Sequence, residues 1–295
     1  RSPVLDLVNA DGSFGCDLRY QGYEICDGKY NLKGLPAVYA AEEEAQTLII
    51  YMKDQVTGLQ VELLYGVLPE YDVITRSAKV INTEEDKIRL TKAQAACIDF
   101  LHGEFDVISF YGRHAMERNM QRTSVGHGAF VIGSRRGTSS HQYNPMMILA
   151  EKETTEDAGT CYGMSFVYSG GFKAEVEKDQ FGQTRMQMGL QEEQFSYPLK
   201  KGEEFVIPEV ILTCSNQGLE KLSQNLQRCI RKNLCRGKYK EKVRPVLINS
   251  WEACYFDFTG EDIYHLAEQA KDLGIDMVVL DDGWFGSRND DNSGL

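Results

Sequence analysis

The feature that most constrains the fold is a short apolar run near the end of the chain, residues 275–280, which ends in Asp281 and Asp282. A glycine and then Trp284 follow directly. The run is too short for a typical helix and holds three β-branched residues, which favours a buried strand. An earlier apolar run, residues 244–251, also ends in polar residues and a tryptophan. Parallel α/β folds bind ligands at this end of their strands, so the sequence predicts a site here.

A helix is expected between the two runs, which makes the segment a strand–helix–strand unit. Thr259 and Asp262 form a capping-box pattern at the start of this helix, with aspartate in place of glutamate, and Gly274 is expected to end it. A parallel sheet of only two strands leaves its edges open and its faces uncovered. The unit therefore implies more chain than the 295 residues present.

The first 214 residues or so have the pattern of an antiparallel β-sandwich. Short segments of alternating apolar and polar residues recur, among them residues 47–52, 59–65 and 73–80, and turn signals separate them. Strands at such regular spacing, without a helix between them, are typical of a large sandwich.

A helix is expected after the sandwich, from residue 216 to about residue 236. Ser215 or Asn216 can cap its start, and Gly237 is expected to end it. Leucine and isoleucine side chains at spacings of three and four give this helix one apolar stripe. The stripe consists of Leu219, Leu222, Leu226, Ile230 and Leu234.

The chain is therefore expected to be mainly β and to have three parts. These are a β-domain over residues 1–215, a linker helix with a charged linker over residues 216–242, and an incomplete α/β domain over residues 243–295. The chain begins without methionine, so a preceding leader sequence stays open.

Composition narrows the class of partner. The net charge of −12 argues against nucleic acid and against an anionic membrane, because either would require a basic surface. No apolar run approaches the roughly 20 residues of a membrane helix. The eight cysteines form no CxxC pair and no zinc-type cluster, so we expect neither metal nor cofactor. Unpaired thiols in a reducing cytoplasm are the favoured interpretation.

Arginine and histidine residues are concentrated in residues 110–122 and 134–145 of this otherwise acidic chain. These segments are either polar loops that meet a ligand or a partner subunit, or a solvated or ion-paired face of the sandwich. The solvated face is favoured, because runs of arginine usually face water.

Asp281 and Asp282 suggest carbohydrate chemistry, in which paired carboxylates are common. Neighbouring residues on a strand point to opposite faces, so these two are poorly placed as an acid and a nucleophile on either side of one bond. They are better suited to accept hydrogen bonds from adjacent sugar hydroxyls. Metal binding is the other option, but no third ligand lies at a suitable spacing. Trp251 and Trp284, the only tryptophans, offer flat faces to a sugar or else pack in the core.

Residues 244–258 and 279–291 closely resemble the opening of the catalytic barrel of glycoside hydrolase family 36 α-galactosidases. The resemblance extends back through residues 134–145 and 54–59 and covers essentially the whole chain. It implies a β-supersandwich, a (β/α)8 barrel and a small C-terminal β-domain. It also implies retaining hydrolysis of terminal α-galactosides such as melibiose and raffinose.

By position in the resemblance, Asp281 and Asp282 would bind the 4- and 6-hydroxyls of galactose, and Trp251 would line the same subsite. The nucleophile and the acid/base would lie on later strands, so both ends of the chain look truncated and the chain alone is expected to be inactive. Many relatives have tryptophan at the position of His114, where it reaches a neighbouring protomer's site within a tetramer. The resemblance thus implies a homo-oligomer, with His114 as a weaker site candidate.

Several functions stay open on sequence alone. A relative that acts on α-N-acetylgalactosaminides, or a galactosyl transferase of the raffinose-synthase type, would share the Asp281 and Asp282 subsite. A non-catalytic sugar-binding or assembly module, with the sandwich as its working part, is the alternative from another class. The open edge of the strand–helix–strand unit argues against that module.

Overall fold

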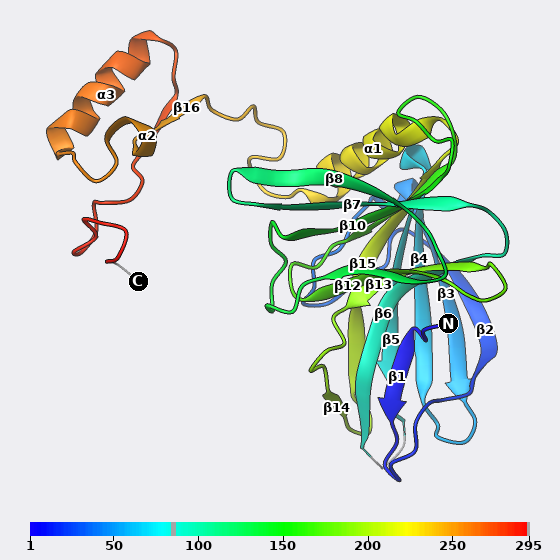
Figure 1. Ribbon diagram of the computed structural model, residues 1–295. Helices are drawn as coiled ribbons and strands as arrows, with labels where there is room; N and C mark the ends of the chain where they lie inside the picture. The colour runs from blue at the N-terminus through cyan, green and yellow to red at the C-terminus, as the bar shows by residue number, and fades with distance from the viewer. Residues whose placement is uncertain (84–86, 294–295) are drawn as a thin grey trace. The chain divides into compact units, whose positions relative to one another are not determined.

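A computed structural model describes residues 1–83 and 87–293 (Figure 1). The chain separates into two compact units, Arg1–Cys235 and Arg236–Leu295. The first unit is built from two antiparallel sheets, and the second is a small α/β segment. The expectation of a mainly β chain with a large sandwich and a first strand–helix–strand unit is confirmed.

The larger sheet of the first unit has nine strands, and every neighbouring pair is antiparallel. Early and late parts of the first unit meet where β5 pairs with β15. In spatial order the strands are β2 (Leu18–Asp27), β3 (Gln46–Asp54), β4 (Gln60–Leu68), β5 (Val73–Ile81), β15 (Glu204–Ser215), β11 (Cys161–Phe166), β10 (Tyr143–Glu151), β7 (Phe105–Arg113) and β8 (Met116–Ser124).

The smaller sheet has six strands, and it too is antiparallel throughout. Strand β9 forms one edge, because it pairs only with β12. The strands in spatial order are β1 (Leu5–Val8), β6 (Ile88–Phe100), β13 (Thr184–Leu190), β12 (Phe172–Lys178) and β9 (Gly128–Gly133), and β14 (Tyr197–Leu199) also pairs with β6.

The main core lies between the two sheets, which are stacked with the six-stranded sheet in front in Figure 1. Leu90, Phe172 and Met188 of the smaller sheet are fully buried against Leu149 and Met164 of the larger sheet. Each such side chain contributes about 1.5–3 kcal/mol through removal of apolar surface from water. Alternation along the strands therefore accounts for the sandwich.

A second core lies on the outer face of the nine-stranded sheet, under helix α1 (Gly218–Cys229). Leu219, Leu222 and Leu226 of the expected apolar stripe are buried there. The helix therefore belongs to the first compact unit, with β11 and β15 beneath it. Two short 3₁₀ helices, η1 (Glu42–Glu44) and η2 (Pro69–Tyr71), complete this unit.

The ends of this helix differ from the sequence expectation. Gln217 is the N-cap, and no side chain caps it, because Ser215 still belongs to β15 and its hydroxyl accepts from the Gln217 amide at 3.0 Å. The C-terminal turn widens into a π-helix, η3 (Ile230–Leu234), and ends before Gly237. The expectations of a Ser215 or Asn216 cap and of termination at Gly237 were therefore wrong.

The second unit contains two short parallel strands, β16 (Leu247–Asn249) and β17 (Met277–Val279). They are joined through helix α2 (Trp251–Cys254) and helix α3 (Gly260–Asp272). Among residues 236–293, only Ser250 and Ala270 are buried. Apolar side chains on both strands are about half exposed, such as Leu247 at 52% and Met277 at 45%.

Helix α3 begins with the expected capping box. The Thr259 hydroxyl accepts from the Asp262 amide, and the Asp262 carboxylate accepts from the Thr259 amide at 2.7 Å. The Thr259 hydroxyl also donates to the Asp262 carboxylate at 2.7 Å, and this bond, followed by the one from the Thr259 amide, holds the pKa of Asp262 below its usual value. Gly274 follows the helix with φ of +76°, a conformation that favours glycine, so the expected stop is confirmed.

We expect Thr259→Ala to destabilise helix α3 by about 1 kcal/mol, because the Asp262 amide loses its acceptor and the Asp262 carboxylate loses the hydroxyl that donates to it. Amide hydrogen exchange of residues 260–272 measures the change directly. Ser287→Ala, in the same unit and without a side-chain hydrogen bond among the described residues, is the matched control. Unchanged protection of α3 in Thr259→Ala would show that the cap contributes nothing.

The described helices include none that is long and apolar enough to cross a membrane. All eight cysteines have free thiols in the structure. Burial raises the pKa of Cys161 to about 11 and that of Cys229 to about 12. Neither buried thiol is therefore poised to act as a nucleophile at neutral pH.

Candidate functional site

The site predicted from the sequence lies where the two parallel strands of the second unit end. The register places Asn249 of β16 beside Val279 of β17. The residues that follow, Ser250 on one strand and Asp281 on the other, are therefore brought together at the carboxyl edge of the sheet. This is the edge at which parallel sheets bind their ligands.

Asp281 is held by the neighbouring strand. Its Oδ2 accepts from Asn249 Nδ2 at 2.7 Å, and its own amide donates to Ser250 Oγ at 3.1 Å. Ser250 is completely buried, so this second anchor is shielded from water. The orientation of the Asp281 carboxylate is consequently fixed before any ligand arrives.

Asp282 is held from the other side, by the loop that follows. Arg288 Nη2 donates to Asp282 Oδ2 at 3.0 Å, and the Arg288 guanidinium lies 5.4 Å from the ring centre of Phe256. The hydrogen bond to Asp282 is the largest cause of a raised pKa for Arg288, so the arginine stays charged. The other oxygen of Asp282 accepts no hydrogen bond from the residues that the structure describes.

The two carboxylates do not lie on a strand. Strand β17 ends at Val279, and Asp281 Oδ1 accepts the amide of Asp282 at 2.9 Å within the loop. The argument that alternation on a strand sends them to opposite faces was therefore wrong, because turn geometry governs both. The next residue, Gly283, has φ of +94°, and a Cβ there would lie 3.1 Å from Phe258. Glycine thus allows the turn to pack against the aromatic residues after α2.

The two tryptophans have different surroundings. Trp251 opens helix α2, and its partly buried ring meets the rings of Tyr255 and Phe256 edge-on at 5.3 and 4.9 Å. Trp284 is 62% exposed and touches only the ring of Phe285 among the described aromatic residues, at 5.3 Å. Two aromatic rings thus support Trp251, and one of them, Phe256, also lies near the Arg288 that pairs with Asp282, whereas Trp284 has one aromatic neighbour among the described residues.

His114 is found in the first unit, in the turn between β7 and β8. The side chain is exposed, and the next residue, Ala115, adopts φ of +61°. The β7–β8 hairpin projects from the edge of its sheet (Figure 1). The role predicted for His114 toward a neighbouring protomer stays a prediction.

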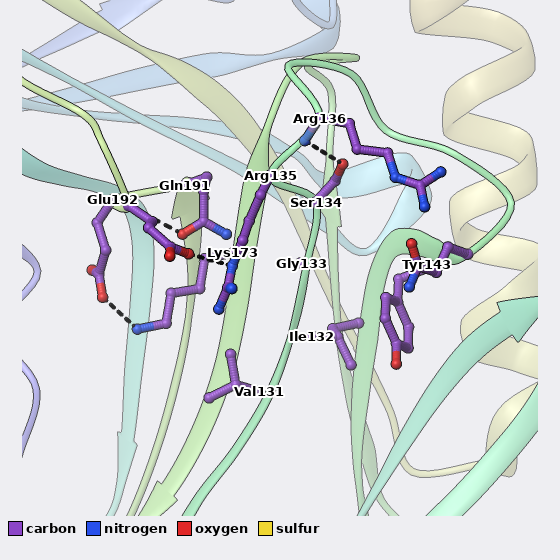
Figure 2. A pocket seen from close by; sticks show the side chains of 12 residues that line it. Val131, Ile132, Gly133, Ser134, Arg135, Arg136, Tyr143, Lys173, Gln191 and Glu192 are labelled. Atoms are coloured by element: carbon purple, nitrogen blue, oxygen red, sulfur yellow. Dashed lines mark hydrogen bonds and ion pairs between the residues drawn. The ribbon is translucent and has the colours of Figure 1, made fainter.

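Five residues of the segment 134–145 line a groove of 840 Å³ in the first unit (Figure 2). Arg135 is exposed and pairs with Glu193, and Arg136 is exposed, as expected of a solvated or ion-paired face. The two arginines and Tyr143 also line this hollow together with Lys173 and residues after β13. Lys173 lies on β12, far from this loop in sequence, and no local pattern connects the two. Within the described part of the chain, no group of three or more His, Cys, Asp or Glu residues could hold a metal ion.

The chain thus consists of a large β-sandwich followed in sequence by an α/β segment with two anchored carboxylates. The glycosyl hydrolase family 36 N-terminal domain matches residues 1–200, and the melibiase domain matches residues 204–295. The chain belongs to glycoside hydrolase family 36.

Named relatives agree with this family. The chain is 62% identical over its whole length to the bifunctional alpha-galactosidase/sucrose kinase AgaSK of Mediterraneibacter gnavus, and covers 32% of that protein. It is 45% identical to alpha-galactosidase Mel36A of Lactobacillus acidophilus and covers 40% of it. The chain thus spans about a third to two fifths of the length of these relatives.

Solved structures share the fold. The galactosidase domain of AgaSK superposes with a TM-score of 0.96 at 62% identity, and this chain covers 41% of it. The α-galactosidase AgaA of Geobacillus stearothermophilus superposes with a TM-score of 0.97 at 44% identity, again over 41% of its chain. Each match covers all of the present chain.

Proposed function

We propose that this chain is the N-terminal part of a longer retaining α-galactosidase, which removes terminal α-linked galactose from melibiose- and raffinose-type oligosaccharides. The observation that carries the proposal is the pair of anchored carboxylates, Asp281 and Asp282, at the carboxyl edge of parallel strands. Relatives named as α-galactosidases support it. Variants of the relative AgaA have been solved in complex with stachyose and with raffinose.

In this proposal Asp281 and Asp282 bind substrate and do not transfer the proton. The unused oxygen of Asp282 is free to accept a sugar hydroxyl, and the oxygens of Asp281 each keep a second lone pair. Hydroxyls that donate to a carboxylate form strong, directional bonds. The axial 4-hydroxyl distinguishes galactose from glucose, so this pair selects the sugar.

The proposal assigns β16 and β17 to the start of a (β/α)8 barrel. Half-exposed apolar side chains such as Leu247 and Met277 support this assignment, because strands in a parallel barrel are covered on both faces. The nucleophile and the acid/base then come from later strands. The 295-residue chain would accordingly bind galactose without hydrolysing a galactoside.

The proposal extends to the assembly and its location. We expect a cytoplasmic homo-oligomer, a tetramer, in which the β-domains meet and His114 approaches a neighbouring protomer. The projecting β7–β8 hairpin and the free thiols are consistent with this expectation. Sedimentation of the longer protein, with and without His114→Ala, measures the oligomer directly.

Tryptophan fluorescence tests the proposed function, because Trp251 and Trp284 both lie in the second unit. Galactose should change the emission of the 295-residue chain at a concentration at least about tenfold lower than the concentration of glucose that is needed. Glucose would lose one hydrogen bond to a charged group, and such a loss corresponds to about this factor. The chain alone should release no nitrophenol from p-nitrophenyl α-galactoside. Equal responses to the two sugars, or hydrolysis by the chain itself, would contradict the proposal.

A further inference from the structure

The groove lined by Arg135 and Arg136 has an immediate neighbour. The groove of 840 Å³ adjoins a second hollow of 410 Å³, and the two share Ser134, Arg135, Gln191 and Glu193. Both volumes lie in the range of small-molecule sites. Together they form a continuous depression beside β9, the edge strand of the six-stranded sheet, and this depression is called the β9 groove below.

One wall of the β9 groove is held by buried ion pairs. Lys173 Nζ lies 2.7 Å from Glu175 and 2.6 Å from Glu192, and Glu192 also pairs with Lys92 at 3.1 Å. The side chains of Lys173 and Glu175 are only 15% and 6% exposed. Gln191 accepts the Glu193 amide at 3.2 Å. The polar groups of this wall are thus positioned without a ligand.

The opposite wall is a loop fixed at both ends of its turn. Ser134 Oγ donates to the Thr138 carbonyl at 2.5 Å, and the Ser139 amide donates to the Ser169 carbonyl at 2.8 Å. This loop presents Arg136 across the groove from Lys173, and Tyr143, the first residue of β10, lies on the same side as Arg136 (Figure 2). The Arg136 guanidinium has no hydrogen bond or ion pair with any described residue. The N–H groups of the Arg136 guanidinium are therefore available to donate hydrogen bonds to a ligand.

The mixture of groups in the β9 groove selects a class of ligand. Arg135 pairs with Glu193, and Lys173 pairs with Glu175 and Glu192, so most of the charge that lines the groove is neutralised by neighbouring side chains. Among the lining residues that the structure describes, Arg136 keeps an unpaired charge, and one free guanidinium suits a neutral hydroxyl-rich ligand better than a polyanion. Amide, guanidinium and carboxylate groups alternate as donors and acceptors, which matches hydroxyl groups that do both. Aromatic surface is present in both hollows, from Tyr143 in the larger one and from Tyr168, Phe195 and Phe205 in the smaller one. Such rings pack against the C–H faces of sugars.

We propose that the β9 groove is an accessory binding site for a neutral oligosaccharide, separate from the galactose subsite at Asp281 and Asp282. The identity of the sugar rests on the proposed function, so raffinose is the probe. Such a site would hold substrate on the β-domain and would raise its local concentration without taking part in bond cleavage.

Two measurements on the 295-residue chain separate the two sites. Calorimetric titration with raffinose counts all bound sugar, whereas tryptophan fluorescence reports only the second unit, since the first contains no tryptophan. We expect calorimetry to detect two sites and fluorescence one. Arg136→Ala should lower the raffinose affinity of the β9 groove, the site detected by calorimetry alone, by about tenfold, because a hydrogen bond to a charged group is lost. The fluorescence titration should be unchanged.

Arg231→Ala is the matched control, because the Arg231 side chain is also exposed and its guanidinium has no hydrogen bond or ion pair among the described residues. Tyr143→Phe, which keeps the ring, should retain most of the affinity that Tyr143→Ala loses. A single calorimetric site that coincides with the fluorescence titration would overturn the proposal. So would an Arg136→Ala variant that changes the sedimentation of the protein and leaves raffinose binding intact, since the groove would then be an interface between copies.

The proposed function and the accessory site fail in different ways. Loss of the fluorescence response, with the Arg136-dependent calorimetric site retained, would contradict the galactose subsite alone. A retained fluorescence response without a second calorimetric site would contradict the β9 groove alone.

Discussion

Replacing Glu209 with alanine is expected to lower the free energy of unfolding of the first unit by about 3–5 kcal/mol, the usual cost of leaving one partner of a buried ion pair without the other. Lys29 Nζ lies 2.6 Å from Glu209 Oε1, and the two side chains are 1% and 0% exposed. Burial is the largest cause of a lowered pKa for Lys29, and Glu209 opposes it. Without Glu209, the ammonium group would have to lose its proton or draw water into the core.

Glu209 also ties a loop to the nine-stranded sheet. Its second oxygen accepts the Val38 amide at 2.7 Å, while Lys29 donates to the Tyr30 carbonyl at 3.1 Å. The carboxylate therefore satisfies one buried ammonium group and one buried amide, and alanine would leave both without this partner. Glu209→Gln keeps the shape and an acceptor, so we expect it to cost less than alanine.

Urea unfolding followed by far-UV circular dichroism measures this effect, since neither tryptophan reports on the first unit. The control is Glu62→Ala, which breaks a pair with Lys79 at 3.2 Å on the same sheet. The side chains of that pair are 25% and 30% exposed, so its loss should cost about 1 kcal/mol or less. Equal midpoints for the two alanine variants would show that burial of the Lys29–Glu209 pair contributes nothing.

The Lys29–Glu209 pair shows where sequence reasoning reaches its limit. The strands of the sandwich follow from alternation, because a period of two is a local property of the chain. Lys29 and Glu209 are 180 residues apart, and each has the sequence context of an ordinary surface charge. Only the pairing of β5 with β15 and the loop before β3 bring them together. Tertiary pairing of this kind has no local signal.

The candidate site was more accessible to prediction, because its residues follow directly on two apolar strands. Asp281 and Asp282 were found from that position alone. The anchors Asn249 and Arg288 were not assigned roles, since they depend on strand register and on the fold of a loop. The short helix α2 after β16 was also missed, because Trp251 was interpreted as the end of a strand.

The β9 groove illustrates a different limit. The sequence shows that arginines are concentrated in this segment, but amino-acid composition does not reveal whether the surface they form is concave or convex. Lys173 and Glu192 come from β12 and from the segment after β13, so the opposite wall is supplied by residues outside the arginine-rich segment. The hollow that these residues line could therefore be recognised only in the three-dimensional arrangement.

Asp282→Asn in the longer protein is expected to reduce kcat/KM for an α-galactoside by about a hundredfold, because a carboxylate that accepts from substrate is replaced by a weaker neutral acceptor. The substitution keeps the side-chain volume, and Arg288 can still donate to the amide oxygen. The loss should therefore appear in substrate binding and in turnover, with the fold retained. Galactose binding to the 295-residue chain, followed by tryptophan fluorescence, should weaken in parallel.

Asp291→Asn provides the matched control, because Asp291 is an exposed aspartate of the same loop without a hydrogen bond or ion pair among the described residues. Arg288→Met separates the two roles of Asp282. If Asp282 served only to hold Arg288, Arg288→Met would lose as much activity as Asp282→Asn. If Asp282 binds the sugar, as we propose, Arg288→Met should lose distinctly less, since the carboxylate remains to accept the hydroxyl. Equal losses in the two variants would assign Asp282 to the loop and leave Asp281 as the sugar ligand.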